Sequence, residues 1–344
     1  MMNSEAQLIK RITAAIPSET GAHGRALNRN AVSLGIGDDA AVISPNGKTD
    51  WVLSCDAFLE GIHFLSKTYP PDSVGYKSLA RATSDLAAVG ATPKLFLLTL
   101  ALPADRTGDW LEGFLRGMGR AARNLGVRLL GGDTTKFPLV SISITVAGKI
   151  EKGRAVARSG ARPGDLIYVS DTLGRAQLGL ELMQNRLGKT ARYRRLLQPH
   201  LYPKIRLQLG AWLARQRLAT AMMDLSDGLS SDLARLCDSS KVGARLFENR
   251  IPRVRIPADS KLAKFKLDSL QMALHGGEDY ELLFTVSPDT RTELRSAPGF
   301  KELVSIGEIT REKRILLETA DGRTRPLRIR GWDSFRIAQP SENA

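Results

Sequence analysis

The sequence is poor in the residues that bind soft metals or form disulfides. Only two cysteines, Cys55 and Cys237, occur among 344 residues, and the four histidines are scattered along the chain. Two thiols cannot build a disulfide framework or a four-thiolate zinc site, and isolated histidines do not make a histidine-ligated metal centre. We therefore expect any metal ion to be held by oxygen ligands.

Long hydrophobic runs are also missing. No uncharged apolar stretch reaches the roughly 18 residues that a membrane span needs, and Glu5, Lys10, Arg11 and Pro17 interrupt the N-terminal segment before a signal-peptide core could form. Hydrophobic residues make up 42% and charged residues 25% of the chain, as in folded soluble proteins. We expect a cytoplasmic protein of about two domains that does not enter a membrane.

Acidic residues are fewer than basic ones, and the formal net charge is +14. Such a charge first suggests a nucleic-acid partner. Almost all of the excess lies in two segments, however: Arg186 to Arg217 has nine basic and no acidic residues, and Arg311 to Arg330 has seven basic and three acidic. A solvated helix face or hairpin is the simpler interpretation of both, and a basic nucleic-acid-binding protein that uses the first segment stays as an alternative.

The hydrophobic pattern alternates between strands and helices in both halves of the chain. The first half predicts strands over 51–58, 95–102, 127–130 and 140–146 and helices over 73–89 and 110–125; the second predicts strands over 166–170, 221–224, 244–247 and 281–286 and helices over 174–186, 203–218 and 229–239. Glu151 to Gly164 between them contains no hydrophobic run. We place a boundary there, with an N-terminal domain over 1–150 and a C-terminal α/β domain over 151–340.

Five short motifs place an aspartate among glycine, serine or threonine residues. They are Gly35-Ile-Gly-Asp-Asp-Ala40, Ser54-Cys-Asp56, Thr83-Ser-Asp85, Gly131-Gly-Asp-Thr-Thr135 and Asp224-Leu-Ser-Asp-Gly228, and a further acidic cluster follows at Gly276-Gly-Glu-Asp-Tyr-Glu281. One such aspartate is usually a helix cap or turn residue. We expect these to follow the ends of strands and to converge, which requires cations between them, and Mg²⁺ is commonly shared between carboxylates and substrate phosphates. The motifs therefore predict an enzyme that acts on nucleotide phosphates.

The familiar phosphate-binding and catalytic strings are absent from the sequence. No Gly-x4-Gly-Lys-Ser/Thr loop, kinase-type His-Arg-Asp or Asp-Phe-Gly string, or Gly-x-Ser-x-Gly elbow occurs. Two loose dinucleotide patterns begin at Gly35 and Gly117, but the first has Asp38 and Asp39 where a pyrophosphate would approach and the second lies in a predicted helix. We interpret both as chance matches.

In their order along the chain, the motifs resemble those of the thiamine-monophosphate kinase family. The resemblance rests on the first, fourth and fifth motifs above, on Ser84-Asp-Leu-Ala-Ala-Val-Gly-Ala, on Arg158-Ser-Gly-Ala-Arg-Pro-Gly-Asp and on the Gly276 cluster, and it extends from about residue 5 to about residue 336. The family belongs to a superfamily with aminoimidazole-ribonucleotide synthetase, whose members share an N-terminal α/β domain that dimerises through its sheet and a C-terminal α/β domain. The strings Gly-Gly-Glu-Asp-Tyr-Glu and Arg330-Gly-Trp-Asp favour the thiamine enzyme, and another ATP-dependent enzyme of the superfamily stays as an alternative.

The resemblance implies Mg²⁺-dependent transfer of the γ-phosphoryl group of ATP to thiamine monophosphate, giving thiamine diphosphate and ADP in a homodimeric enzyme. In the family the transfer is direct and uses several Mg²⁺ ions. Transfer between two anions needs positioning and charge neutralisation more than a covalent nucleophile, so we assign no covalent catalytic residue.

Carried over by position, the resemblance also implies site residues. The implied metal ligands are Asp38, Asp56, Asp85, Asp133, Asp224 and Asp227. The implied ATP-binding residues are Gly132, Asp133, Arg158 and Ser226, and those for thiamine monophosphate are His63, Glu278 and Trp332. A guanidinium grips phosphate oxygens in a bidentate way, a carboxylate hydrogen-bonds an aminopyrimidine, and an aromatic face packs on a cationic thiazolium.

The chain departs from the family at Cys55, where a threonine is common. A thiol has little affinity for a hard cation, whereas a hydroxyl helps to bind Mg²⁺. We therefore leave Cys55 out of the metal-ligand set, although its backbone carbonyl could still serve.

Overall fold

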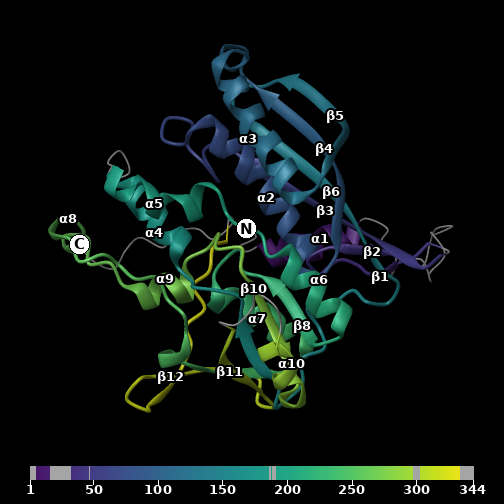
Figure 1. The fold of residues 1–344 in the computed structure, drawn as a ribbon, viewed down its shortest axis with the longest axis vertical. Helices are drawn as coiled ribbons and strands as arrows, with labels where there is room; N and C mark the ends of the chain where they lie inside the picture. The colour runs from purple at the N-terminus through teal and green to yellow at the C-terminus, as the bar shows by residue number, and fades with distance from the viewer. Residues whose placement is uncertain are drawn as a thin grey trace.

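The computed structural model describes residues 5–15, 32–45, 47–185, 187, 191–296 and 303–333. In this part of the chain the strands form a six-stranded sheet, ordered β1-β2-β3-β6-β4-β5, and a seven-stranded sheet, ordered β13-β12-β9-β11-β7-β10-β8. The first sheet is built from the first half of the chain and the second sheet from the second half, and they occupy opposite ends of the molecule (Figure 1). The expected two-part α/β architecture is confirmed.

The first sheet consists mainly of long antiparallel strands. Its strands are β1 (Val32–Leu34), β2 (Ala41–Ile43), β3 (Thr49–Leu59), β4 (Thr92–Leu102), β5 (Arg128–Lys136) and β6 (Ser141–Glu151), preceded by helix α1 (Glu5–Ala15). Strand β5 pairs in parallel with β4 and forms the edge of the sheet, and all nine of its residues are exposed.

One face of the first sheet is covered by helix α2 (Pro71–Ala88), which packs against β3, β6 and β4, and α3 (Asp109–Leu125) packs on α2. Pro71 starts α2 because its fixed φ suits the first helical position. The helices approach closely at Gly117, where an added Cβ would lie 1.8 Å from the carbonyl oxygen of Asp72. Residues Cys55 on β3 and Thr99 on β4 are exposed.

The second sheet is antiparallel except where β12 runs parallel to β9. Its strands are β7 (Leu166–Val169), β8 (Ala219–Asp224), β9 (Gly243–Phe247), β10 (Leu282–Val286), β11 (Val304–Thr310), β12 (Ile315–Glu318) and β13 (Thr324–Pro326). Its helices are α4 (Arg175–Gln184), α5 (Ala191–Leu201), α6 (Leu207–Gln216), α7 (Leu229–Ser240), α8 (Ser260–Ala263), α9 (Ser269–His275) and α10 (Arg291–Ser296). Short 3₁₀ turns occur at Ala104–Arg106, Glu248–Arg250 and Pro288–Thr290. Every residue of β10 is buried, which places the core of this half around that strand.

Helix α2 joins the two halves. It follows β3 in sequence, yet it also packs against α6 and β8 of the second half, and Figure 1 shows it near the middle of the molecule. Contact with α6 is close, since an added Cβ on Gly210 would lie 2.1 Å from the carbonyl oxygen of Ala87. Side chains on α2 can therefore face groups from both halves.

The helix predicted over 203–218 is partly wrong, because residues 203–206 belong to no helix or strand and α6 begins at Leu207. Arg206 explains the delay: its guanidinium donates hydrogen bonds to Asp171 and Glu281, which holds this segment against the second sheet. Within the described residues, no helix is long and apolar enough to cross a membrane.

Candidate functional site

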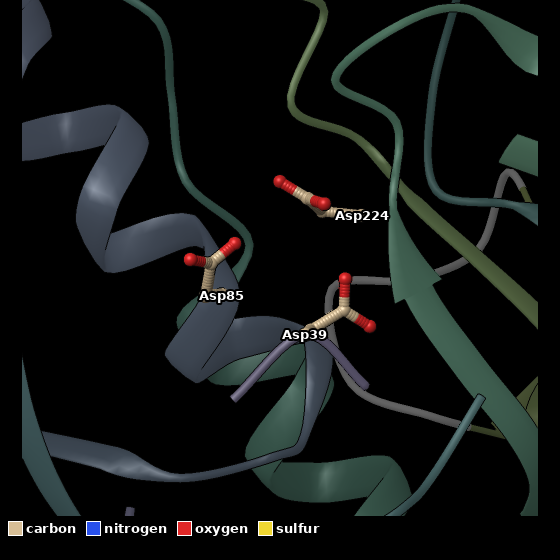
Figure 2. Close-up of side chains that lie close together, drawn as sticks. All are labelled: Asp39, Asp85 and Asp224. Carbon is tan, nitrogen blue, oxygen red and sulfur yellow. The ribbon is translucent and has the colours of Figure 1, made fainter. Parts of the chain in front are cut away.

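Three carboxylates from distant parts of the sequence converge between the two halves of the molecule. Asp39 lies in the turn between β1 and β2, Asp85 lies in α2, and Asp224 is the last residue of β8. Each offers an oxygen atom, and these three atoms lie within 4.8 Å of one another. Figure 2 shows the carboxylates directed toward a common space. We call Asp39, Asp85 and Asp224 the carboxylate triad.

The charges of the carboxylate triad oppose one another. Burial raises the pKa of Asp85 well above its usual range, and the nearby Asp224 and Asp56 raise it further. Burial together with Asp39 raises the pKa of Asp224 to about 7. Burial also raises the pKa of Asp39, although Arg158 opposes this, and Oδ2 of Asp39 has no hydrogen-bond partner among the described residues. A divalent cation with oxygen ligands fits this arrangement because it would compensate the repulsion.

The family resemblance predicts that Asp38 is a metal ligand, whereas the structure places its neighbour Asp39 in the carboxylate triad. The carboxylate of Asp38 instead accepts hydrogen bonds from the backbone N–H groups of Asp39, at 3.0 Å, and Arg158, at 3.1 Å. Consecutive residues in a turn direct their side chains differently, so the motif alone could not distinguish the two. A metal-binding role for Asp38 stays a prediction.

Helix α2 lines the site with three charged residues spaced four apart, which places them on one side of the helix. Lys77 forms an ion pair with Glu278, Arg81 pairs with Asp56 at 2.9 Å, and Asp85 belongs to the carboxylate triad. The hydroxyl of Ser54 on β3 donates a hydrogen bond to Asp85. Sequence reasoning missed Lys77 and Arg81, although their spacing from Asp85 is a visible signal.

Two further predicted ligands lie beside the carboxylate triad, and each is paired with an arginine. Arg81 holds Asp56, and Arg235 of α7 holds Asp227. The charge of Asp56 raises the pKa of both Asp85 and Asp224, which shows that the three carboxylates share one electrostatic environment.

Asp133 is not one of the carboxylates that converge in the carboxylate triad. Across the first sheet, Ala57 pairs with Ser143, Ser143 with Thr99, and Thr99 with Asp133. Three strand spacings correspond to about 14 Å between β3 and β5. Gly132 and Asp133 both lie on the exposed edge strand β5.

The expectation that each aspartate motif follows a strand end is wrong for most of the motifs. Asp56 lies within β3, Asp133 within β5 and Asp85 within α2, whereas Asp224 does end its strand, β8. Strands β3 and β5 continue past the apolar residues because backbone pairing with β6 and β4 extends through the polar ones. Small polar residues around an aspartate therefore do not predict the end of a strand in this chain.

The loop that contains Glu278 is fixed against the loop that contains Ser226. The backbone N–H of Glu278 donates to the carbonyl of Ser226 at 2.8 Å, and that of Tyr280 donates to Leu225 at 2.9 Å. Glu278 and Tyr280 have positive φ angles of 67° and 50°, which cost about 1–3 kcal/mol each and persist where the surroundings fix them. The predicted ATP-binding serine and the predicted substrate carboxylate are thus neighbours.

His63 lies beside the site as a neutral imidazole. Its Nδ1 accepts a hydrogen bond from the backbone N–H of Leu59 at 3.0 Å, which assigns the proton to Nε2. Burial, assisted by Arg81, lowers the pKa of His63 to about 4, while Glu278 and Asp56 oppose the shift. Nε2–H is therefore a donor at neutral pH.

Arg158 and Trp332 approach the site from the second half of the chain. Nη2 of Arg158 lies 2.6 Å from Oδ1 of Asp39, at the edge of the carboxylate triad. The backbone N–H of Trp332 donates to the carbonyl of Asp227 at 3.2 Å, and its side chain is 55% exposed. A separate groove of about 1050 Å³, lined in part by Arg123, contains none of the predicted site residues.

Both halves match models of known domains. Residues 37–150 match the N-terminal domain of AIR synthase related proteins, and residues 162–318 match the C-terminal domain of the same proteins. The chain is 40% identical over 316 residues to the thiamine-monophosphate kinase of Escherichia coli strain K12, an alignment that covers 90% of this chain and 94% of the relative.

Solved structures with the same architecture span nearly the whole chain. AaThiL complexed with AMPPCP and TMP is similar with a TM-score of 0.80 and 31% identity, covering 96% of this chain and 97% of that one. The thiamine-monophosphate kinase of Stenotrophomonas maltophilia K279a is similar with a TM-score of 0.70 and 36% identity, covering 94% and 98%.

Proposed function

The chain belongs to the thiamine-monophosphate kinases, which combine the two AIR synthase related domains, and on this basis we propose that it phosphorylates thiamine monophosphate with ATP. The products are thiamine diphosphate and ADP, which makes the enzyme a phosphotransferase with a phosphate group as acceptor. The observation that carries the proposal is the convergence of three carboxylates, those of the buried Asp39 and Asp224 and the half-buried Asp85, beside Arg158. Phosphoryl transfer between anions depends on such positioning and charge compensation.

Mg²⁺ is the cation that suits the donor set. Asp39, Asp85 and Asp224 provide oxygen atoms only, and hard cations prefer oxygen ligands. We propose that these three hold Mg²⁺ and that Asp56 and Asp227 join them when their arginine partners are displaced. Bound Mg²⁺ would neutralise charge on the phosphates of both substrates.

Residues around the carboxylate triad would bind the two substrates. Arg158, freed from Asp39, presents a planar fork that fits phosphate oxygens of ATP, and Ser226 is the second proposed ATP-binding residue. His63 offers Nε2–H as a neutral donor, and Glu278 offers a carboxylate to the aminopyrimidine. The exposed ring of Trp332 would pack on the thiazolium.

We propose that the protein is a homodimer formed through its first sheet. An exposed edge strand and an exposed sheet face invite pairing with a second chain. Leu129, Leu130 and Leu97 are 59%, 68% and 40% exposed on these strands. Because Asp133 lies on this exposed edge and outside the carboxylate triad of its own chain, we propose that it reaches the metal site of the partner subunit.

Two coarser assignments accompany this proposal. We propose a boundary that divides an ATP-binding and dimerisation domain, 1–150, from a C-terminal domain, 151–340. We also propose a cytoplasmic location, because ATP is available there and because Cys55 and Cys237 are both unpaired thiols.

A product assay tests the proposed function. Purified protein with ATP, Mg²⁺ and thiamine monophosphate should form thiamine diphosphate and ADP in equal amounts, resolved by chromatography, and chelation of Mg²⁺ should stop the reaction. Unphosphorylated thiamine serves as the control acceptor and should give no product. Turnover of the aminoimidazole-ribonucleotide synthetase substrate without formation of thiamine diphosphate would contradict the assignment.

A further inference from the structure

Lys77, a residue of α2, has a buried cationic side chain. Its side chain is 1% exposed, and Nζ lies 2.7 Å from Oε2 of Glu278. A buried ammonium group is costly unless it is paired, so this contact fixes the place of both side chains. The ion pair joins α2, which lies between β3 and β4 of the first sheet in sequence, to the loop before β10 in the second sheet.

Lys77 is the cation that keeps Glu278 ionised. Burial raises the pKa of Glu278, but the charge and the hydrogen bond of Lys77, together with weaker contributions from nearby groups, outweigh burial and hold the pKa below its usual range. His200 lies 3.4 Å from the same Oε2, yet burial and Lys77 lower the pKa of His200 to about 3, so it is neutral at pH 7. Its Nε2 pairs with the hydroxyl of Tyr69 at 2.6 Å. Arg81 contributes a second, weaker charge.

The two oxygens of Glu278 have different surroundings. Oε2 contacts Lys77 and His200, whereas Oε1 has no hydrogen-bond partner in the part of the chain that the structure describes. The Glu278 side chain is 25% exposed, in contrast to the closed environment of Lys77. With its backbone held by Ser226, Glu278 therefore presents one free oxygen in a fixed direction.

The position of Lys77 on α2 relates this oxygen to the metal site. Lys77 precedes Asp85 by eight residues, which corresponds to about 12 Å along the helix axis. Both residues belong to one packed helix, so the distance between the Glu278 contact and the carboxylate triad is set by α2. A substrate held at Glu278 would thus have its phosphate at a defined distance from the metal site.

We propose that Lys77 is a positioning residue for the phosphate acceptor, because it orients Glu278 so that Oε1 accepts a hydrogen bond from an N–H group of the substrate. This inference rests on the proposed function. Lys77 does not contact the substrate in this proposal and acts on it only through Glu278.

The test compares Lys77→Met with Glu278→Gln and with the double variant. Isothermal titration with thiamine monophosphate, without ATP, should show affinity weakened about 10- to 100-fold in each single variant, since hydrogen bonds to charged groups are of this strength. The KM for ATP should stay within about twofold, because Arg158 and Ser226 are not in contact with Lys77. Lys94→Met, an exposed lysine on β4, serves as the control and should bind normally.

The double variant separates positioning from stability. Lys77→Met leaves the half-buried carboxylate of Glu278 without its cation and should lower the melting temperature. The double variant Lys77→Met with Glu278→Gln has no unpaired charge and should recover most of that loss. The affinity of the double variant for thiamine monophosphate should not recover. It should be within about twofold of the affinity of Glu278→Gln alone, because Lys77 acts only through Glu278. Independent, additive effects of the two substitutions on affinity would overturn the inference.

A crystal structure of Lys77→Met distinguishes failure of this inference from failure of the proposed function. A displaced Glu278 carboxylate in this variant supports the positioning role of Lys77. If the unaltered protein binds no thiamine monophosphate, that failure refutes only the proposed function. An unmoved carboxylate overturns the inference.

Discussion

At the scale of single residues, the carboxylate triad carries a cost in stability that a metal ion would remove. Asp39, Asp85 and Asp224 each offer an oxygen atom within 4.8 Å of the other two, and burial together with repulsion from neighbouring aspartates raises their pKa values. Because these carboxylates repel one another in the folded protein, we expect that they serve to bind a metal ion and do not stabilise the fold. Substitution and titration test this view separately.

Asp85→Asn should abolish turnover without destabilising the metal-free protein. Loss of a metal ligand removes several kcal/mol of transition-state stabilisation, so kcat should fall by about 10³-fold or more. The melting temperature in the presence of a chelator should be unchanged or higher, because one repelling charge is gone. Asp72→Asn, on the same helix but in an exposed ion pair with Arg120, is the control and should keep its activity. Retained activity with a large loss of stability would give Asp85 a structural role.

The stability of the metal-free protein should depend on pH through Asp85 and Asp224. Their folded-state pKa values lie above the unfolded value of about 4, so the folded protein binds more protons and this contribution to stability falls as pH rises toward about 7, the folded pKa of Asp224. Added Mg²⁺ should therefore raise the melting temperature more at pH 8 than at pH 5. Asp224→Asn should reduce this difference; an equal effect of Mg²⁺ at both pH values would disprove the linkage.

At the scale of helices and strands, close packing of α2 and α3 supports the site. An added Cβ on Gly117 would lie 1.8 Å from the carbonyl oxygen of Asp72, whereas one on Gly119 would meet only the flexible end of Arg123 at 3.5 Å. Gly117→Ala should lower the free energy of unfolding by about 1–3 kcal/mol or more. Gly119→Ala should raise it by about 0.5–1 kcal/mol, because alanine favours the helix. Chemical denaturation measures the free energy of unfolding of both variants. Equal changes in the two would show that the helices are not in close contact at Gly117.

Most regular elements could be predicted from the sequence, because periodicity reports which side chains are buried. The strand expected over 51–58 is β3, and the helix expected over 73–89 is α2. Helix α5 was not predicted, since its segment is rich in arginine and contains Pro199. The site was harder, because the choice between Asp38 and Asp39 depends on how a turn directs its side chains. Lys77 was missed because its pairing with Glu278, 201 positions away, is a tertiary contact.

At the scale of the whole molecule, the open sheet edge predicts an obligatory second chain. Leu130→Asp places a charge on the exposed surface of β5, where Leu130 is 68% exposed, and should convert a dimer into a monomer by light scattering. Activity should fall with dimer content, because Asp133 would no longer reach a partner. The control is Leu115→Asp on α3, which is 46% exposed and lies away from the sheet edge. An active monomer would contradict both the dimer and the shared site.

Mixing two inactive variants tests whether Asp133 acts across the dimer. Asp85→Asn and Asp133→Asn chains, unfolded together and refolded, should regain about a quarter of the normal activity, since half of the dimers are mixed and each has one intact site. If Asp133 served its own chain, each mixed dimer would have two defective sites and no activity would return.

The exposed strand β5 also matters for the life of a newly made chain. In the proposed homodimer, a chain that has not yet assembled carries a nine-residue edge that can pair with any extended segment, so correct assembly competes with aggregation. Arg128 and Lys136 at the ends of the strand place positive charges beside its apolar residues, and like charges on neighbouring chains discourage indiscriminate stacking. The yield of active enzyme in a cell should therefore depend on the rate of synthesis, because that rate sets how long each chain waits for a partner.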